Sequence, residues 1–368
     1  MKTKLFVRCK KCLTTSTRPR IEFFNGVCSA CINFQERKKI NWKLREKQLW
    51  KICNKFRKGN GEYDVVVPAG GGKDSSYVAW MLKNKFKMNP LCVCCEPPLI
   101  TKLGLENLNK FKSSGFDLIY LSESKHDKKM NKIAFIKSGL PQHNWLASIQ
   151  IAPLKIAYKF EIKFVMWGEE GESMYGGKNT YKNKFNVDTS LFNLKLNNNP
   201  INKFIKDSSI KKNYYWSILN KKEKKQYANI FKCYWSYFEK WDESKHLKFA
   251  KKYCGLKFDK IKQSNAINNH SHTDQKMFAL HMYLAYLKFG FGRATTDTSI
   301  DIRHKKLTRK QAIKIVKKYD RIFPKNYLSD YCKYFNMTQK NFIKILHKFI
   351  NKDIFEIKNK KIILLDTI

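Results

Sequence analysis

The segment that most constrains the fold is VVVPAGGGKDSSYVAW, residues 65–80. Three valines lead into three glycines, and a lysine, an aspartate and two serines then open a segment with helical patterning. A strand, a glycine-rich turn and a helix start in this order are typical of phosphate sites. The glycines let backbone N–H groups close around an anion, and the helix N-terminus adds a partial positive charge. The segment therefore predicts an α/β protein with a phosphate-binding loop; a glycine-rich turn without a ligand is the alternative.

Two familiar phosphate motifs do not fit this loop. A Walker A motif needs a hydroxyl residue directly after its lysine and a glycine six positions before it. Here Asp74 follows Lys73, and Val67 stands six positions before it. A dinucleotide-binding GxGxxG motif also fails, because Ser75 stands where its third glycine belongs.

Four short apolar segments indicate the sheet around this loop: 63–68, 90–95, 116–121 and 162–168. Stretches long enough for one helix each separate them. Continuous apolar strands alternating with helices predict a doubly wound, mostly parallel sheet that is buried on both faces. Ligands bind such sheets at the carboxyl ends of the strands. The glycine loop and WGEEGESMYGG (167–177) both follow strands, so we expect them to open onto one crevice.

Four cysteines predict a zinc module at the N-terminus. Cys9 and Cys12 form one CxxC pair, and Cys28 and Cys31 form another after fifteen intervening residues. This spacing lets four thiolates complete a tetrahedron around Zn²⁺ and leaves no open position, which predicts a structural metal. Two chance CxxC pairs, or a redox pair, are the alternatives.

The remaining chain divides by composition. A helix rich in Lys and Trp follows the zinc module, and polar and aromatic residues dominate from about residue 179. Helices are predicted at 221–241, 272–292 and 307–320, and a small hairpin around Lys358. The predicted organisation is a zinc module (1–34), a linking helix (35–60), an α/β nucleotide-binding domain (61–180), a polar insertion (181–265) and a helical C-terminal region that completes the site (266–368).

The net charge of +44 raises the question of nucleic acid. Only 10 of the 74 basic residues are arginines, and the lysines are spread over every region. Base-specific and bidentate phosphate contacts favour arginine, so the charge indicates compositional bias, and nucleic-acid binding is not expected. The sequence offers neither a signal peptide nor an apolar run of about 20 residues, so a cytoplasmic protein without membrane insertion is expected.

The loop Gly70-Gly71-Gly72-Lys73-Asp74-Ser75 resembles the SGGxDS loop of the PP-loop ATP pyrophosphatases. Further segments, PQHNW (141–145), MWGEEGESMYGG (166–177) and YLKFGFGRATTDTSIDIRHKKLTRKQAI (286–313), resemble the N-acetyl sugar amidotransferases of bacterial surface-polysaccharide and flagellar-glycan synthesis. The four-cysteine module fits the same family. One departure is Gly70, which replaces the first serine of the motif and removes one hydroxyl.

This resemblance implies the conversion of a sugar acetamido group into an acetamidino group. The acetamido oxygen would attack the α-phosphorus of ATP and release pyrophosphate, with Mg²⁺ at the phosphates. Ammonia would then displace AMP from the O-adenylyl imidate. The pathways implied are O-antigen synthesis and the synthesis of pseudaminic or legionaminic acid derivatives. The family also implies a glutaminase subunit and a barrel subunit resembling the histidine-pathway cyclase, which together supply ammonia; the chain itself shows no glutaminase signature.

Candidate roles follow for particular side chains, each with a structural alternative. Lys73 is expected to contact phosphate, and Asp74 to hold Mg²⁺ or to cap the helix. Glu169 is expected to hold Mg²⁺ or to orient ammonia, with a solvated loop glutamate as the alternative. The arginine Arg293 is expected to stabilise the leaving pyrophosphate, with an internal ion pair as the alternative. The remaining candidates are Gly70, Gly71, Gly72, Ser75, Lys288 and Arg303 for ATP, and His143, Asn144, Glu172 and Asp297 for the sugar substrate.

Two rival functions share the loop. A PP-loop tRNA-modifying enzyme, a thiolase or a lysidine-type synthetase, would account for the positive charge. A zinc-knuckle nucleic-acid adaptor with a degenerate ATP site is the non-enzymatic alternative, but the retained Lys73, Asp74 and Ser75 argue against degeneracy.

Overall fold

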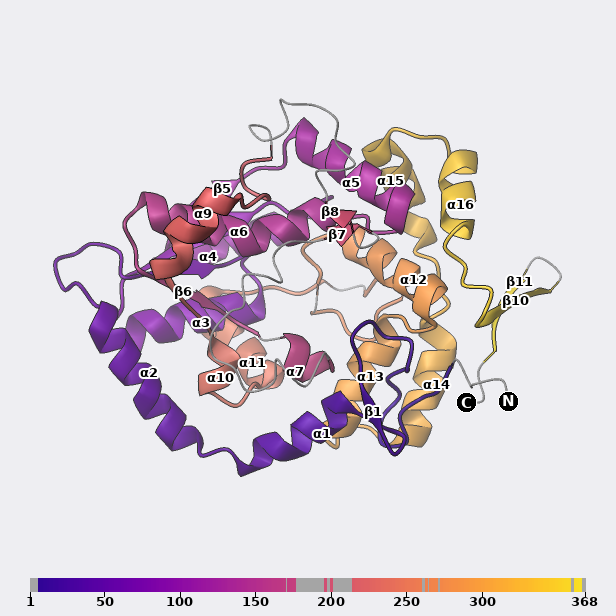
Figure 1. The fold of residues 1–368 in the computed structure, drawn as a ribbon, viewed down its shortest axis with the longest axis horizontal. Coiled ribbons are helices and arrows are strands. Elements are labelled where there is room, and N and C mark those ends of the chain that lie inside the picture. The colour runs from indigo at the N-terminus through magenta and orange to yellow at the C-terminus, as the bar shows by residue number, and fades with distance from the viewer. Residues whose placement is uncertain are drawn as a thin grey trace.

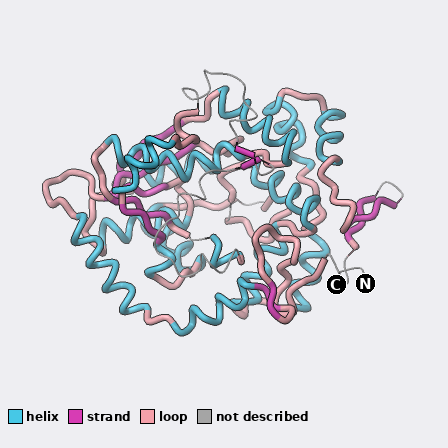
Figure 2. Tube along the Cα trace, in the orientation of Figure 1, coloured by secondary structure: helices cyan, strands magenta, loops and turns pink. Residues whose placement is uncertain are grey.

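The structure is a computed structural model. It describes residues 6–169, 171–176, 195–196, 199–200, 214–259, 262–263, 265–270, 272–358 and 361–365. Its centre is one sheet of five parallel strands, which confirms the predicted α/β class. The strands are β3 (Val65–Pro68), β4 (Pro90–Cys95), β5 (Asp117–Leu121), β6 (Phe164–Trp167) and β9 (Phe231–Tyr234). They gather in one half of the molecule, with helices around them (Figure 2).

The strand order, β5-β4-β3-β6-β9, fixes the position of the ligand crevice. The chain moves outward from β3 through β4 to β5, then crosses back to place β6 on the other side of β3. The order reverses between β3 and β6, and open α/β sheets bind ligands outside the carboxyl ends of the strands at such a point. The glycine loop follows β3, and Glu169 lies two residues after β6. Both predicted segments therefore meet at this edge.

The fifth strand corrects the predicted helix at 221–241. That range forms α9 (Lys221–Gln226), the 3₁₀ turn η5 (Tyr227–Asn229), strand β9 and the short helix α10 (Trp235–Phe238). Phe231–Tyr234 pairs in parallel register with Phe164–Trp167, and the side chain of Cys233 is fully buried. The aromatic spacing suited a helix, but pairing with β6 supplies hydrogen bonds and burial that a surface helix would lack. The range predicted to be an insertion thus contributes an edge strand to the sheet.

Helices cover both faces of the sheet (Figure 1). On one face, Val65, Val67 and Cys92 share a core with residues of α2, α3, α4, α10 and α11. On the other, Val66, Leu91 and Val93 pack against α6. The bounds are α2 (Trp42–Phe56), α3 (Lys73–Asn84), α4 (Lys102–Ser113), α6 (His143–Lys159) and α11 (Glu243–Cys254). Burial on both faces is the reason that the strands are continuously apolar.

The C-terminal region is a separate helical layer with its own core. Its helices are α12 (Met277–Phe289), α13 (Arg293–Arg303), α14 (Arg309–Tyr319), α15 (Leu328–Phe335) and α16 (Gln339–His347). Phe135 of α5 (Lys125–Ser138) packs into this core between Phe335 and Phe342. The predicted C-terminal hairpin is present as β10 (Phe355–Lys358) and β11 (Lys361–Leu364). No helix in the described part of the chain is both long and apolar enough to cross a bilayer.

The N-terminal module contains the hairpin β1 (Phe23–Phe24) and β2 (Val27–Cys28), followed by α1 (Ser29–Glu36) and the turn η1 (Arg37–Lys39). Asn25 and Gly26 both have positive φ, as the tight turn between these strands requires. Helix α2 then runs along the outside of the molecule from this module to the sheet (Figure 1). Shorter elements are α7 (Gly171–Tyr175), β7 (Lys195–Leu196), β8 (Asn199–Pro200) and η6 (Lys325–Tyr327).

The glycine loop offers a matched test of this geometry. Gly71 has φ of +71°, and a Cβ there would lie 2.8 Å from the backbone of Leu108, whereas a Cβ on Gly70 would have nothing within 4 Å. A left-handed conformation alone costs a residue with a Cβ about 1–2 kcal/mol. Gly71→Ala should therefore lower the free energy of unfolding in urea by more than about 1 kcal/mol, and Gly70→Ala by less than about 0.5 kcal/mol. Equal losses in the two variants would contradict this description of the loop.

Candidate functional site

The glycine loop leaves open space where a ligand would approach. Gly72 is the N-cap of α3, and Gly71 packs against the backbone of α4. A Cβ on Gly70 or Gly72 would touch nothing within 4 Å, so these two residues border free volume. Ser75 donates a hydrogen bond from its Oγ to the Gly72 carbonyl at 3.3 Å. The loop thus joins a helix N-terminus to an open backbone surface, as a phosphate cradle requires.

Lys73 and Asp74 belong to an ionic cluster that ties α3 to α11. The Lys73 Nζ lies 2.6 Å from Asp74 Oδ2 and 3.3 Å from Glu243 Oε2. His246 Nδ1 lies 2.8 Å from Asp74 Oδ1, and the ring nitrogen donates because an ionised carboxylate only accepts. Burial opposes ionisation of Asp74, but Lys73 and His246 together lower the pKa of its carboxyl to about 2. Asp74 is therefore a carboxylate at any physiological pH.

The ammonium group of Lys73 is held in the same way. Burial alone would lower its pKa, but the neighbouring Asp74 and Glu243 raise that pKa above its usual range. A fixed, partly buried cation beside a glycine loop suits a phosphate oxygen.

Glu169 lies on the other side of the switch point in a protected setting. Tyr175 of α7 donates a hydrogen bond to Glu169 Oε2 at 2.9 Å, and Oε1 is buried with no hydrogen-bond partner among the described residues. Burial, with the nearby charges of Glu243 and Asp74, raises the pKa of Glu169 to about 8. The group is mostly protonated at neutral pH, so it differs sharply from Asp74 although both are carboxyls in one site.

Helix α13 brings Arg293 and Asp297 to the same region. The buried Arg293 donates from Nε to Asp297 Oδ2 at 3.3 Å, and its guanidinium lies 5.4 Å from the ring centre of Phe278. Burial raises the pKa of Asp297 to about 6, with Arg293 opposing the shift and Glu243 adding to it. The internal ion pair, which was the alternative role for Arg293, is therefore present with Asp297 as the partner.

The start of α13 is already neutralised by the protein. Asp320 accepts hydrogen bonds from the backbone N–H groups of Gly292 and Thr295 at 2.9 and 3.0 Å. A Cβ on Gly292 would lie 2.8 Å from Asp320 Oδ1. This glycine permits the close approach of a carboxylate, so the N-terminus of α13 is occupied from within the chain.

One cavity borders the glycine loop and a second borders the ionic cluster. The first has a volume of about 190 Å³ and lies at the carboxyl ends of β3 and β4. Its walls are apolar except for Asp274: Pro68, Ala69, Gly70, Val93, Cys94, Cys95, Pro97, Ile100, Leu108, Trp145, Ile149 and Pro153. The second cavity, of about 240 Å³, reaches Lys73 through Glu243. It is far more polar, with Trp241 and Met174 beside Asn268, His270, Asp297, Asp301 and Lys306.

Four of the predicted ligand contacts lie elsewhere. The Lys288 ammonium donates to the carbonyls of Ser138 and Gly139 at the end of α5. Arg303 donates to the Met174 carbonyl and contacts the Cys12 Sγ at 3.8 Å. His143 and Asn144 are buried at the start of α6, where the Asn144 side chain donates to Asp127. Glu172 lies in α7, and its side chain is outside the described part of the structure.

Sequence reasoning missed Glu243, His246 and Asp274. Glu243 and His246 lie on α11, in a range predicted to be an insertion, and no motif marks either residue. Asp274 reaches the first cavity because two backbone hydrogen bonds hold its segment in place. The Thr101 N–H donates to the Asp274 carbonyl, and the Lys276 N–H donates to the Leu99 carbonyl. The one sequence signal for Glu243 and His246 is helical spacing, which places both on the same face of a helix as Ala250. Ala250 is buried, so that face points inward.

The four predicted cysteines form a compact cluster. Their ligand atoms all lie within 4.8 Å of one another, with Cys9 Sγ 3.9 Å from Cys31 Sγ and Cys12 Sγ 3.6 Å from Cys28 Sγ. A tetrahedron with Zn–S bonds of about 2.3 Å has edges of about 3.8 Å, so the cluster fits Zn²⁺. The module also braces α13, since Leu13 N–H donates to Ser299 Oγ and the Arg8 guanidinium to Thr295 Oγ1.

Comparisons with known proteins place these residues in context. Residues 236–366 match a family model described as the C-terminal domain of WbpG-like LPS biosynthesis proteins. An uncharacterized protein of Methanocaldococcus jannaschii is 32% identical over 124 residues, which cover 33% of this chain and 44% of that protein. The chain therefore spans less than half the length of this relative. The range that matches the WbpG-like model contains Glu243, His246, Arg293 and Asp297. These residues lie on α11 and α13, which follow the strands of the five-stranded sheet in the chain.

Metal removal tests the cysteine cluster. Cys28→Ser should abolish one stoichiometric zinc, measured by atomic absorption, because a structural site needs all four thiolates. The melting temperature should fall, and hydrogen exchange in α13 should speed up, because the module packs on that helix. Cys332→Ser, a half-buried cysteine outside the cluster, is the matched control. Full zinc content in the Cys28 variant would refute the site.

The raised pKa of Glu169 predicts a particular pH dependence of stability. The folded protein retains this proton up to about pH 8, whereas an unfolded chain loses it near the ordinary glutamate pKa. Because the folded state binds more protons, the protonated Glu169 contributes its full stabilisation at pH values below the pKa of the unfolded chain. This stabilisation is lost as pH rises from there through the pKa of the folded protein. Wild type should therefore lose stability relative to Glu169→Gln as pH rises toward about 8. The exposed Glu106→Gln should give a flat difference over the same range in urea titrations; a flat difference for Glu169 would contradict its buried, protonated state.

Proposed function

We propose that this protein is an ATP-dependent, AMP-forming amidotransferase that converts an acetamido group of a sugar into an acetamidino group in LPS or related glycan biosynthesis. The observation that carries the proposal is the ion pair between Lys73 of a PP-loop-like turn and Glu243 of α11, since α11 lies in the range that matches the WbpG-like family. A nucleotide loop and a glycan-pathway domain thus build one site.

The first cavity supports ATP as the energy source. It touches the glycine loop through Gly70 and has the apolar walls, including the indole of Trp145, that suit a purine base. A nucleoside seated there would direct its phosphates along the open side of Gly70 and Gly72 toward Lys73. The residues present therefore fit the nucleotide, with Lys73 as the cation for the departing pyrophosphate.

Mg²⁺ fits the site as a metal shared with phosphate. In the described part of the chain, the four-cysteine cluster alone brings three or more possible ligand atoms within 4.8 Å of one another. Mg²⁺ usually takes only one or two carboxylates and completes its shell with phosphates and water. Asp74, which is ionised, is the residue that would hold it.

The second cavity supports a polar organic acceptor. A tryptophan wall with carboxylate, amide and imidazole groups suits sugar hydroxyl and acetamido groups, which need many hydrogen bonds and one apolar face. In the proposed reaction the acetamido oxygen attacks the α-phosphorus, the bond to pyrophosphate breaks, and an oxygen–phosphorus bond forms. Ammonia adds to the imidate carbon, loses a proton, and AMP leaves with the former acetamido oxygen. Glu169, mostly protonated at rest, would exchange that proton once ionised.

A separate source of ammonia is part of the proposal. Burial raises the pKa of every cysteine outside the zinc cluster, namely Cys53, Cys92, Cys94, Cys95, Cys233, Cys254 and Cys332. A glutaminase thiol needs a lowered pKa, so none of them suits that role. We therefore propose that a glutaminase subunit, with a cyclase-like barrel subunit as conduit, delivers ammonia to this chain.

The decisive experiment measures AMP and pyrophosphate release with Mg-ATP and ammonium. A panel of N-acetylated nucleotide sugars and nonulosonic acids is compared with tRNA. Release that depends on a sugar, with the product about one mass unit lighter as NH replaces O, is expected. Lys73→Gln should lower the rate by about 10²–10³-fold, the scale for removing one charge-stabilising donor. The control Lys83→Gln removes an exposed lysine near the opposite end of the same helix and should have no effect. Release that depends on tRNA would overturn the proposal in favour of a tRNA-modifying enzyme.

A further inference from the structure

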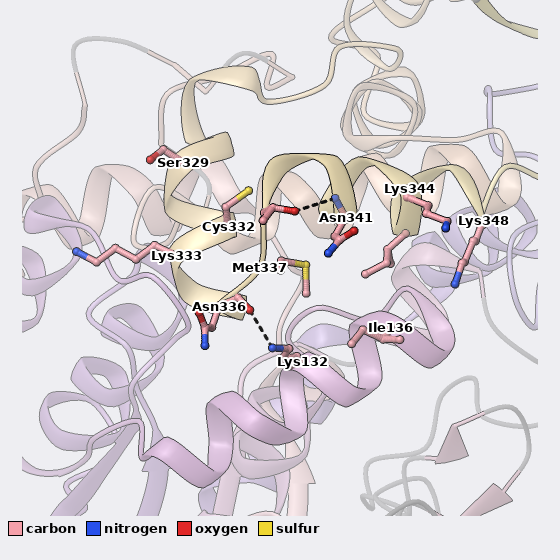
Figure 3. A pocket seen from close by; sticks show the side chains of 12 residues that line it. Lys132, Ile136, Ser329, Cys332, Lys333, Asn336, Met337, Asn341, Lys344 and Lys348 are labelled. Carbon is pink, nitrogen blue, oxygen red and sulfur yellow. Dashed lines mark hydrogen bonds between the residues drawn. The ribbon is translucent and has the colours of Figure 1, made fainter.

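A large hollow of the described surface shares no residue with the glycine loop. It is an open groove of about 920 Å³ between α5 on one side and α15 and α16 on the other. Figure 3 shows Lys333 toward one end, Lys344 and Lys348 toward the other, and Lys132 of α5 between them. The lining residues are Lys132, Ile136, Ser329, Cys332, Lys333, Asn336, Met337, Thr338, Asn341, Lys344, Ile345 and Lys348. None of them lines either cavity of the candidate site.

The groove is positively charged without internal compensation. Four lysines line it and no carboxylate does. The described ion pairs involve none of these four lysines, and the Lys132 ammonium donates instead to the Asn336 carbonyl at 3.1 Å. Helix α16 begins in the groove with Thr338 as its N-cap, and its dipole adds partial positive charge. The groove therefore favours a ligand with several negative charges.

The floor of the groove is apolar, which narrows the class of ligand. Ile136, Met337 and Ile345 are half-buried between the helices, and a methionine adapts its shape to different apolar partners. No arginine and no aromatic side chain lines the groove, although nucleic-acid sites rely on both. A second copy of this chain would bring another net charge of +44 toward the lysines. The apolar floor and the cationic rim together suit an amphipathic peptide segment whose apolar face is flanked by acidic residues.

We propose that this groove binds an acidic amphipathic α-helix of a partner protein. The helix would lie along α5 and α15–α16, with apolar residues at i, i+3 or i+4 and i+7 on the floor. Its carboxylates would pair with Lys333 at one end and with Lys344 and Lys348 at the other. The proposal does not depend on the chemistry of the ATP site, because the two surfaces share no residue.

The test uses a labelled helical peptide of about 18 residues, with leucines on one face and glutamates on both flanks. Binding to the full-length protein is followed by fluorescence anisotropy at about 0.15 M salt, where diffuse attraction is largely screened. The double variant Lys333→Glu/Lys344→Glu should raise the dissociation constant by about tenfold or more, because two ion pairs become repulsions. The control Lys310→Glu/Lys314→Glu makes the same charge change on the exposed surface of α14 and should weaken binding by less than about twofold.

Four further readouts decide the outcome. The peptide should slow hydrogen exchange in α5, α15 and α16, and its glutamine version should bind much more weakly. Equal weakening by the two double variants would overturn the proposal, because attraction would then be diffuse. Tighter binding of a single-stranded oligonucleotide of equal charge, lost in the groove variant, would replace the partner helix with nucleic acid. Self-association that the groove variant abolishes would likewise replace it with a second copy of the chain.

Discussion

The site depends on the burial of one lysine. A buried ammonium is costly unless carboxylates neutralise it, and Lys73 takes one from its own helix and one from α11. Asp74 is in turn held by His246 on the same face of α11. These contacts join residues separated by about half the chain, so α11 must pack on α3 whenever the cluster forms. That packing carries Trp241 and Glu243 to the edge of the sheet and creates the second cavity beside the loop.

The same cluster separates the behaviour of two carboxyls. Asp74 faces a lysine and a histidine, and its pKa falls to about 2. Glu169 faces the carboxylates of Glu243 and Asp74 at a distance and a tyrosine close by, and burial raises its pKa to about 8. One site therefore holds a carboxyl that stays ionised and a carboxyl that can exchange a proton near neutral pH. The neighbouring residues, and not the residue type, therefore decide the protonation state of each carboxyl.

Local signals in the sequence were sufficient for four of the five strands of the sheet and for the four-cysteine cluster. Strands β3, β4, β5 and β6 are short and continuously apolar. The CxxC spacing is a local pattern that can be recognised without knowledge of the fold. Strand β9 was missed because FKCYWSYF has aromatic spacing that also suits a helix, and only the neighbouring β6 decides between them. Glu243 and His246 were missed for the same reason, since their function arises from a tertiary contact. Conversely, Lys288 and Arg303 looked like phosphate ligands because cations are expected near a phosphate loop. In the fold they hold the end of α5 and join α7 to the zinc module.

The position of Arg303 gives the zinc module a structural role in the site. Its guanidinium contacts the Cys12 sulfur and the Met174 carbonyl, and Met174 lines the second cavity. Leu13 and Arg8 fasten the same module to Ser299 and Thr295 of α13, the helix that carries Arg293 and Asp297. Four thiolates around a dication would carry a net negative charge, which the nearby arginine offsets. The module with the four-cysteine cluster thus braces the helix that supplies the buried arginine, although the cluster lies outside the crevice. The N-terminal module, the sheet and the C-terminal helices consequently form one structural unit around the glycine loop, and none of the three would build the site alone.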